Sequence, residues 1–264
     1  NNTFNYNLQN GIFFSSNTGN NIINNTANYN NQSGFKFQLS TRNNIINNTA
    51  NYNNQSGFYF LTRANNNTLT NNTANYNSLM GIFLDSINFT SVNNNILNSN
   101  SFTGLYLNNS RENNLSGNNL TNNLLVQLSI DNSCSNIFTN NSFTGNAINS
   151  TVSAGCNQNL IYNNSFGLIN WNINNLTIMN GLDFDNNLYL QNNLLGLADS
   201  SDVSNLNTSA NIEIRNLTYT SIPQLLKNGV RCDDNPVLCN ITYDVVLGIL
   251  YANISSFSNY TTSN

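Results

Sequence analysis

Histidine is absent from this chain of 264 residues, and charged side chains make up only 7% of it. Without histidine the chain has no Ser-His-Asp triad and no histidine-based metal centre. Its few basic residues are scattered and its formal net charge is −4, which excludes a basic surface for nucleic acid. No run of about 18 apolar residues occurs, so no membrane-spanning helix is expected within this sequence.

A short repeat fills much of what remains. The twelve letters NNTANYNNQSGF at Asn24–Phe35 recur unchanged at Asn47–Phe58, and a third copy, NNTANYNSLMGI, runs over Asn71–Ile82. The spacing is roughly 23 residues, and a fixed period of about 20–50 residues indicates a stacked solenoid. Each unit then buries its apolar side chains only against its neighbours.

The repeat unit favours strands over helices. Apolar residues alternate with polar ones in pairs that follow turn residues, such as Phe35/Phe37, Phe58/Phe60 and Ile82/Leu84. A period of two bounded by turns is typical of short strands, and asparagine is a weak helix former. The sequence therefore predicts an all-β parallel β-helix with about 22–23 residues per coil.

Asparagine at one position of each unit predicts a ladder of side-chain amides along the solenoid, because stacked amides hydrogen-bond to one another and asparagine tolerates sharp turns. The marker is an apolar residue three positions before an asparagine. The expected ladder consists of Asn25, Asn48, Asn72, Asn100, Asn123, Asn141 and Asn164. Packing is the favoured role of this column, and ligand contact is the alternative.

The unit NTLTNNTANYN at Asn67–Asn77, followed by GIFL at Gly81–Leu84, resembles the NosD-like repeats of the carbohydrate-binding and sugar-hydrolase (CASH) β-helix superfamily. The resemblance covers about residues 1–167 and implies a right-handed parallel β-helix of the archaeal or bacterial cell-surface type. The stretches NLNTSANIEI (Asn205–Ile214) and ISSFSNY (Ile254–Tyr260) are similar to a β-rich module that follows such repeats in archaeal surface proteins.

The amino-acid composition and the spacing of apolar residues change after the repeats, which predicts two domains. Both prolines, Pro223 and Pro236, and most of the acidic residues lie late in the chain. Alternating stretches over 210–219 and 244–251 indicate antiparallel strands with one buried face. We expect a parallel β-helix over 1–175 and a β-rich, sandwich-like domain over 176–264 that caps the helix.

Four cysteines allow three pairings. Cys134 and Cys156 lie about one coil apart, whereas Cys232 and Cys239 bracket a short segment. Local pairing, Cys134–Cys156 and Cys232–Cys239, is therefore favoured and implies an oxidising, extracellular location. Zinc binding is the less favoured alternative, because histidine and a CxxC motif are absent. No metal or cofactor is expected.

Many asparagines lie in the N-x-Ser/Thr acceptor sequence and are candidates for N-linked glycans. The candidate positions are Asn24, Asn31, Asn47, Asn54, Asn66, Asn71, Asn88, Asn108, Asn114, Asn119, Asn140, Asn149, Asn163, Asn175, Asn207, Asn216, Asn240, Asn253 and Asn259.

A catalytic site is not expected from the sequence. The only acidic residues of the repeat region are Asp85, Glu112 and Asp131, and glycoside hydrolysis normally needs two carboxylates about 5–9.5 Å apart. Asp85 and Asp131 lie two units apart and meet this need only if they share a face. Two acidic turns contain Asp183, Asp185, Asp199 and Asp202. These residues could bind a calcium ion, but the favoured interpretation is that they are solvated turn residues.

The sequence thus favours an extracellular structural or adhesive cell-surface glycoprotein that is not an enzyme. We expect this protein to associate with copies of itself in a filament or sheath and to carry covalent glycans. The alternative is a carbohydrate-binding module or a polysaccharide lyase or hydrolase, supported by the resemblance and by a stripe of Tyr29, Tyr52 and Tyr76 at one repeat position. An outer aromatic stack that braces the coils is the favoured role of this stripe.

Overall fold

The computed structural model describes residues 1–144, 147–151, 158–173, 177–178, 188–197 and 206–263. These residues form strands and turns, and no α-helix occurs among them. Among them, no helix is long and apolar enough to cross a membrane. The chain divides into two compact units, residues 1–158 with 174–182, and residues 159–173 with 183–264.

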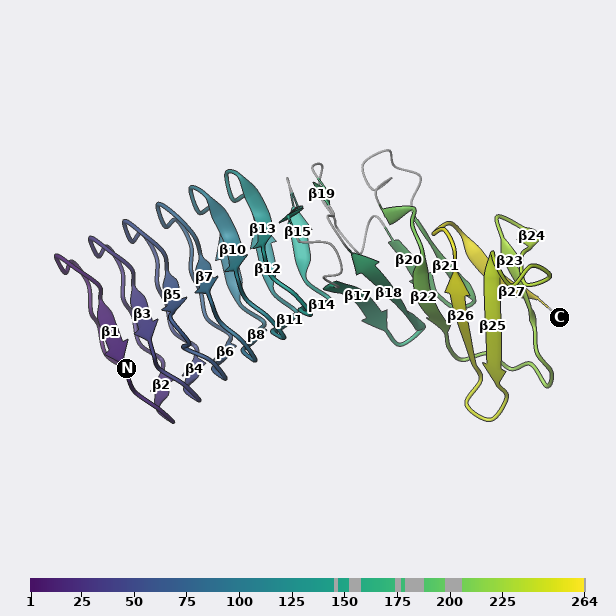
Figure 1. Cartoon of the computed structure of the whole chain (residues 1–264), viewed down its shortest axis with the longest axis horizontal. Helices are drawn as coiled ribbons and strands as arrows, with labels where there is room; N and C mark the ends of the chain where they lie inside the picture. Colours follow the sequence, from purple (N-terminus) through teal and green to yellow (C-terminus); the bar gives the residue numbers. More distant parts are fainter. Residues whose placement is uncertain (145–146, 152–157, 174–176, 179–187, 198–205, 264) are drawn as a thin grey trace. The chain divides into compact units, whose positions relative to one another are not determined.

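Unit one is a parallel β-helix of about six turns, which confirms the predicted fold class. Its coils follow one another along the chain from β1 onward (Figure 1). Each coil contributes one strand to each of two or three sheets, and equivalent residues on adjacent coils are 23 or 24 positions apart.

Three sheets make up the walls of the coil. Sheet 1 contains β1 (Ile12–Ser15), β3 (Phe35–Gln38), β5 (Phe58–Leu61), β7 (Ile82–Asp85), β10 (Thr103–Asn108), β13 (Val126–Asp131), β16 (Ile148–Thr151) and the antiparallel β19 (Thr177–Ile178). Sheet 2 contains β2 (Asn21–Ile23), β4 (Asn44–Ile46), β6 (Thr68–Thr70), β8 (Ser91–Asn93), β11 (Asn114–Ser116) and β14 (Ile137–Thr139). Sheet 3 contains β9 (Ile96–Asn98), β12 (Asn119–Thr121) and β15 (Ser142–Thr144).

The core of unit one consists of apolar columns from each sheet. In sheet 1, Phe37 and Phe60 stack with ring centroids 4.4 Å apart, and both are fully buried. Stacked parallel rings at this spacing bury large apolar areas in every coil. The glycines that precede the strands of sheet 1 sit where no side chain fits, since a Cβ on Gly57 would lie 2.6 Å from the Ala74 Cβ and 2.8 Å from the Gly81 carbonyl oxygen.

Asparagine amides line the corners in three ladders rather than one. Between two successive asparagines of a ladder, the side-chain nitrogen and the backbone N–H of one donate to the Oδ1 of the next, and in the third ladder Thr90 takes the place of one asparagine. Asn48 donates to Asn72 over 3.1 and 2.9 Å, and its side-chain nitrogen also donates to the Ile22 carbonyl over 2.7 Å. Buried amides are thereby satisfied in every coil.

The asparagines of the single predicted column are divided between two of these ladders, and one of them lies outside all three. The first ladder runs through Asn2, Asn25, Asn48, Asn72, Asn95, Asn118 and Asn141. The second runs through Asn7, Asn30, Asn53, Asn77, Asn100 and Asn123. The third runs through Asn20, Asn43, Asn67, Thr90, Asn113 and Asn136.

Asn100 and Asn123 therefore differ from the expectation, because they stack on Asn77 in the second ladder and not on Asn72. The physical reason is a pseudo-repeat of five residues within each coil. Val92 precedes Asn95 by three positions just as Leu97 precedes Asn100, so both asparagines carry the same sequence marker. Asn164 lies outside all three ladders, and its side-chain nitrogen donates to the Leu190 carbonyl.

Unit two contains two antiparallel sheets. In sheet 4, β17 (Gln158–Asn164), β18 (Gly167–Ile173), β22 (Ala210–Ile214), β26 (Ile249–Ile254) and β25 (Cys239–Asp244) are neighbours in that order. Sheet 2 and these strands belong to one eleven-stranded sheet, and sheet 4 is its unit-two part. In sheet 5 the neighbouring strands are, in order, β20 (Leu188–Gln191), β21 (Leu194–Leu197), β27 (Tyr260–Ser263), β23 (Gln224–Lys227) and β24 (Val230–Arg231). The buried ring of Trp171 lies 5.0 Å from Phe257, which lies 6.4 Å from Tyr260.

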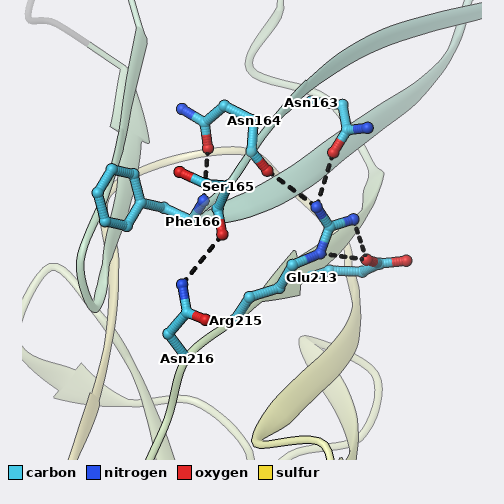
Figure 2. Close-up of polar contacts among 7 residues, drawn as sticks. All are labelled: Asn163, Asn164, Ser165, Phe166, Glu213, Arg215 and Asn216. Carbon is cyan, nitrogen blue, oxygen red and sulfur yellow. Dashed lines mark hydrogen bonds and ion pairs between the residues drawn. The ribbon is translucent and has the colours of Figure 1, made fainter.

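The unit boundary differs from the expected one at residues 175 and 176, because residues 159–173 belong to unit two. β17 and β18 carry this segment, and β18 pairs antiparallel with β22 from Gly167↔Ile214 to Trp171↔Ala210. Figure 2 shows one interaction that holds the turn between β17 and β18. Arg215 donates to the Asn163 Oδ1 over 2.8 Å and to the Asn164 carbonyl over 2.9 Å.

A disulfide joins Cys232 to Cys239. The other expected pair includes Cys156, which lies outside the described residues, so Cys134–Cys156 stays a prediction.

Candidate functional site

The charged side chains of unit one gather on one side of the β-helix. Each lies either in a strand of sheet 1, with its side chain outside the core, or in the corner between sheet 1 and sheet 2. In the strands these residues are Lys36, Asp85 and Asp131. In the corners they are Arg42, Arg63, Arg111 and Glu112. The outer faces of sheets 2 and 3 carry no charged residue in their described strands.

We call this side the charged face, defined as the outer face of sheet 1 together with the corner that follows it. Four of its side chains are basic and three are acidic. In a protein with so few charges, this placement concentrates nearly all electrostatic attraction of unit one on a single surface.

Aromatic rings form one outward column of the charged face. Tyr59, Phe83 and Tyr106 stack across three coils, and each neighbouring pair of ring centroids is 4.9 Å apart. Lys36 continues the column, and its ammonium lies 5.5 Å from the Tyr59 ring centroid and 5.6 Å from that of Phe13. Cation–π attraction favours this placement of the charge.

A polar column runs beside the rings. The strands align Asp85 with Asn108 and Asn108 with Asp131, so the two carboxylates share a column and are separated by two coil spacings of about 4.8 Å each. Asn108 donates from its side-chain nitrogen to the Asp85 Oδ1 over 3.1 Å, and the Tyr106 hydroxyl donates to the Asp131 Oδ2 over 2.6 Å. The condition that the sequence left open, a shared face, is met.

The phenols of this face hold their protons tightly. Partial burial raises the pKa of Tyr106 to about 12, and the hydrogen bond to Asp131 adds to the effect. The pKa of Tyr59 is also raised, first by burial and then by the charge of Asp85. At neutral pH both phenols are therefore hydrogen-bond donors.

The tyrosine stripe lies at another corner, between sheet 3 and sheet 1. Tyr6, Tyr29, Tyr52 and Tyr76 stack with centroids 4.9–5.1 Å apart and planes within 5° of parallel. The rings cover one another's faces and expose their edges, and each residue has a positive φ near 57°. Tyr29 and Tyr52 are covered on both faces by neighbouring rings, which suits the bracing role favoured from the sequence, whereas Tyr6 and Tyr76 are the end members of this stack of four.

The glycan candidates fall into three groups by exposure. Asn88, Asn108 and Asn163 are half-buried, and the side-chain nitrogen of Asn108 is bonded to Asp85. Asn175 lies outside the described residues, and the other candidates are exposed. Asp183, Asp185, Asp199 and Asp202, the acidic turn residues for which calcium was the less favoured alternative, also lie outside the described residues.

Comparison with known families agrees with the fold. Residues 1–120, somewhat less than half of the chain, match the family described as "Right handed beta helix region". A search of curated proteins finds no match.

Solved structures with a similar fold include enzymes. A single-residue variant of the periplasmic alginate epimerase AlgG is 18% identical, with a TM-score of 0.56, over 61% of this chain and 42% of that one. AlgG itself is 21% identical, with a TM-score of 0.53, over 55% and 35% of the two chains. The A-module of the Azotobacter vinelandii mannuronan C-5 epimerase AlgE4 is 16% identical, with a TM-score of 0.47, over 54% and 43%.

The chain thus spans about two fifths of the length of the epimerases that it resembles, and at these identities the likeness shows the fold alone. The expectation that the chain is not an enzyme is nevertheless wrong. Enzymes with this fold exist, so the sequence did not justify excluding an enzyme.

Proposed function

We propose that unit one binds an acidic polysaccharide along the charged face. The observation that carries the proposal is the placement of every charged side chain of unit one on this surface. Lys36 and the three corner arginines attract the carboxylates of the sugar chain, and arginine suits planar carboxylate groups in particular. The Asp85, Asn108 and Asp131 column accepts and donates hydrogen bonds to sugar hydroxyls.

The spacing of the face also supports an extended ligand. Successive rings and polar groups repeat every coil, at 4.9 Å for the ring centroids. This interval is close to the length of one pyranose residue in an extended β-1,4-linked chain, so consecutive sugars would meet equivalent coils. The stacked rings make the face rigid, which lowers the entropic cost of binding. The similarity in fold to alginate epimerases is further support.

A panel of polysaccharides tests the proposal. Alginate and polygalacturonate should bind, and cellulose and mannan should bind weakly, as measured by affinity electrophoresis or calorimetry. Binding should weaken as salt rises, because exposed charges are screened. The variants Lys36→Gln and Arg63→Gln should weaken binding, whereas Asn44→Ala on the outer face of sheet 2 serves as the matched control. Equal binding by all three variants would show that the polysaccharide does not bind at the charged face.

A reaction on the bound polysaccharide is the second candidate, and the Tyr106–Asp131 pair favours it. The pair places a proton donor and a carboxylate in adjacent columns, and such groups exchange protons with substrates in general acid–base catalysis. Incubation with alginate and polygalacturonate should be followed for new reducing ends, unsaturated products and changed epimer ratios. Product formed by the wild type and lost in both Tyr106→Phe and Asp131→Asn would support this candidate.

An extracellular, glycosylated and self-associating surface protein stays part of the proposal. The Cys232–Cys239 disulfide supports an oxidising location. Intact-mass measurement of the protein from its native source tests for glycans, and sedimentation over a range of concentrations tests for self-association. A single unmodified mass and a concentration-independent monomer would contradict these parts.

A further inference from the structure

Sheet 4 carries a row of four asparagines whose amides are unused. The strand pairing aligns Asn170 with Asn211, Asn211 with Asn253, and Asn253 with Asn240. Asn211, Asn240 and Asn253 are exposed, whereas Asn170 is half-buried. The ladder asparagines of unit one bond to one another, but within the described part of the chain none of these four side chains makes a hydrogen bond.

A cavity of about 260 Å³ lies over one end of this row. Its lining residues are Asn170, Ser209, Ala210, Asn211, Asn253 and Ile254. The Asn170 Oδ1 is fully buried and receives no hydrogen bond from the described part of the protein. A buried acceptor without a partner is unfavourable, and a hydrogen bond donated by a ligand hydroxyl would satisfy it. The cavity is slightly smaller than pockets for drug-sized molecules, which suits a ligand with a single ring.

The next row on the same face adds a carboxylate and a ring. Glu213 is aligned with Tyr251, and the Tyr251 side chain is among the exposed aromatics of unit two. Two guanidinium bonds from Arg215, over 3.1 and 2.6 Å, end on the Glu213 Oε2 (Figure 2). Arg215 is itself tied to Asn163 and Asn164, so the carboxylate has a defined position.

We propose that the Asn170–Asn211–Asn253 row and its cavity form a second binding site, for a neutral saccharide of one ring. Side-chain amides donate and accept side by side, as neighbouring sugar hydroxyls require. A neutral ligand fits because Glu213 is the one charged residue of these two rows, and it is already paired with Arg215. This site lies wholly within unit two and does not depend on the charged face of unit one.

The sequence adds one condition. Asn253 and Asn240 are glycan candidates, and a glycan on Asn253 would occupy the cavity. The full chain should therefore be produced in a host without N-glycosylation. The variant Ser255→Ala keeps the Asn253 amide but removes the acceptor sequence, and it serves as the control when a glycosylating host is used.

Saturation-transfer NMR with glucose, galactose, mannose and N-acetylglucosamine tests the site. At least one sugar should receive saturation from the wild type. Asn211→Ala and Asn170→Ala should each weaken binding about tenfold, in line with the loss of one or two hydrogen bonds. Asn207→Ala, at an exposed asparagine outside the row, and Lys36→Gln, on the charged face, should bind like the wild type.

Three outcomes would overturn the proposal. They are no saturation transfer to any of the four sugars, unchanged binding by both row variants, or, when glucuronate is added to the panel as a charged sugar, transfer to glucuronate alone. Melting temperatures of all variants accompany the NMR, and a row variant that loses binding counts as support only if it melts like Asn207→Ala. Loss of polysaccharide binding in Lys36→Gln with the single sugar retained would separate the two sites.

Discussion

The hydroxyl of Tyr106 on β10 donates a hydrogen bond of 2.6 Å to the Oδ2 of Asp131 on the next coil. The two residues lie 25 positions apart in the chain and belong to two different outward columns of sheet 1. The bond is possible because parallel coils stack in register, which brings a side chain next to its neighbour one coil and two positions further on.

The first prediction concerns the ionisation of Tyr106. Its pKa in the folded protein is about 12, above the ordinary value of 10.0, so the folded state holds the proton more tightly than the unfolded state. The resulting stabilisation is fully present below about pH 10 and is lost as the pH rises toward about 12. Asp131→Asn should lower the pKa of Tyr106, because it removes a negative charge and a strong acceptor.

Spectrophotometric titration of the phenolate absorbance measures this effect. Burial also raises the pKa of Tyr260 to about 12, and the pKa of Tyr59 is raised as well, so both residues should titrate late together with Tyr106. Tyr260→Phe removes the phenol in unit two and serves as the control. Identical titration curves for Asp131→Asn and the wild type would show that the bond does not persist in solution.

The second prediction concerns the first amide ladder. Replacing Asn48 or Asn72 by Leu should destabilise the protein by about 1–3 kcal/mol, because neighbouring buried amides and carbonyls lose their partners. Both asparagines are almost completely buried, whereas Asn54 is exposed. Asn54→Leu should therefore change the free energy of unfolding little, as measured by urea denaturation. Equal losses at the two kinds of position would contradict the ladder.

A third prediction follows from the close approach at Gly57. Gly57→Ala should cost about 1–3 kcal/mol, because the added methyl group would overlap with Ala74 and with the backbone of the next coil. A side chain at Gly19 would meet no atom within 4 Å of its Cβ, and the φ of Gly19 is +71°. Gly19→Asn is the matched control, since asparagine tolerates positive φ. A melting temperature for Gly57→Ala equal to that of the control would refute the overlap.

The fourth prediction concerns the disulfides. Opening the Cys232–Cys239 loop with the double change to serine should destabilise unit two by about 2–3 kcal/mol, because the unfolded chain gains the entropy that loop closure had removed. Peptide mapping without reduction should recover the Cys232–Cys239 bond and tests the predicted Cys134–Cys156 bond in the same experiment. A crosslink between an early and a late cysteine would contradict the local pairing of both.

Much of unit one could be predicted from the sequence, because contacts between adjacent coils of a solenoid join residues that are about one repeat period apart. The repeated Asn-Asn-Thr segments mark corners, where Asn24, Asn47 and Asn71 adopt positive φ. The alternation of Phe35 and Phe37 indicated both the strand and its buried face. The ladder failed at Asn100 because a marker of two residues could not distinguish positions five residues apart.

Two sites required the tertiary structure. The charged face joins side chains from several coils, and their common side became visible only when the corners and strands of each coil were placed. The asparagine row of sheet 4 depends on antiparallel pairing between strands from distant parts of the chain. No period in the sequence encodes this pairing.

The sequence by itself determined the period, the strand alternation and the all-β class of this protein. These are local properties, repeated often enough that each copy confirms the others. The tertiary structure alone decided which asparagines stack, where unit one ends and which residues share a surface. Those outcomes depend on register, and a shift of one residue turns every side chain of a strand to the opposite face.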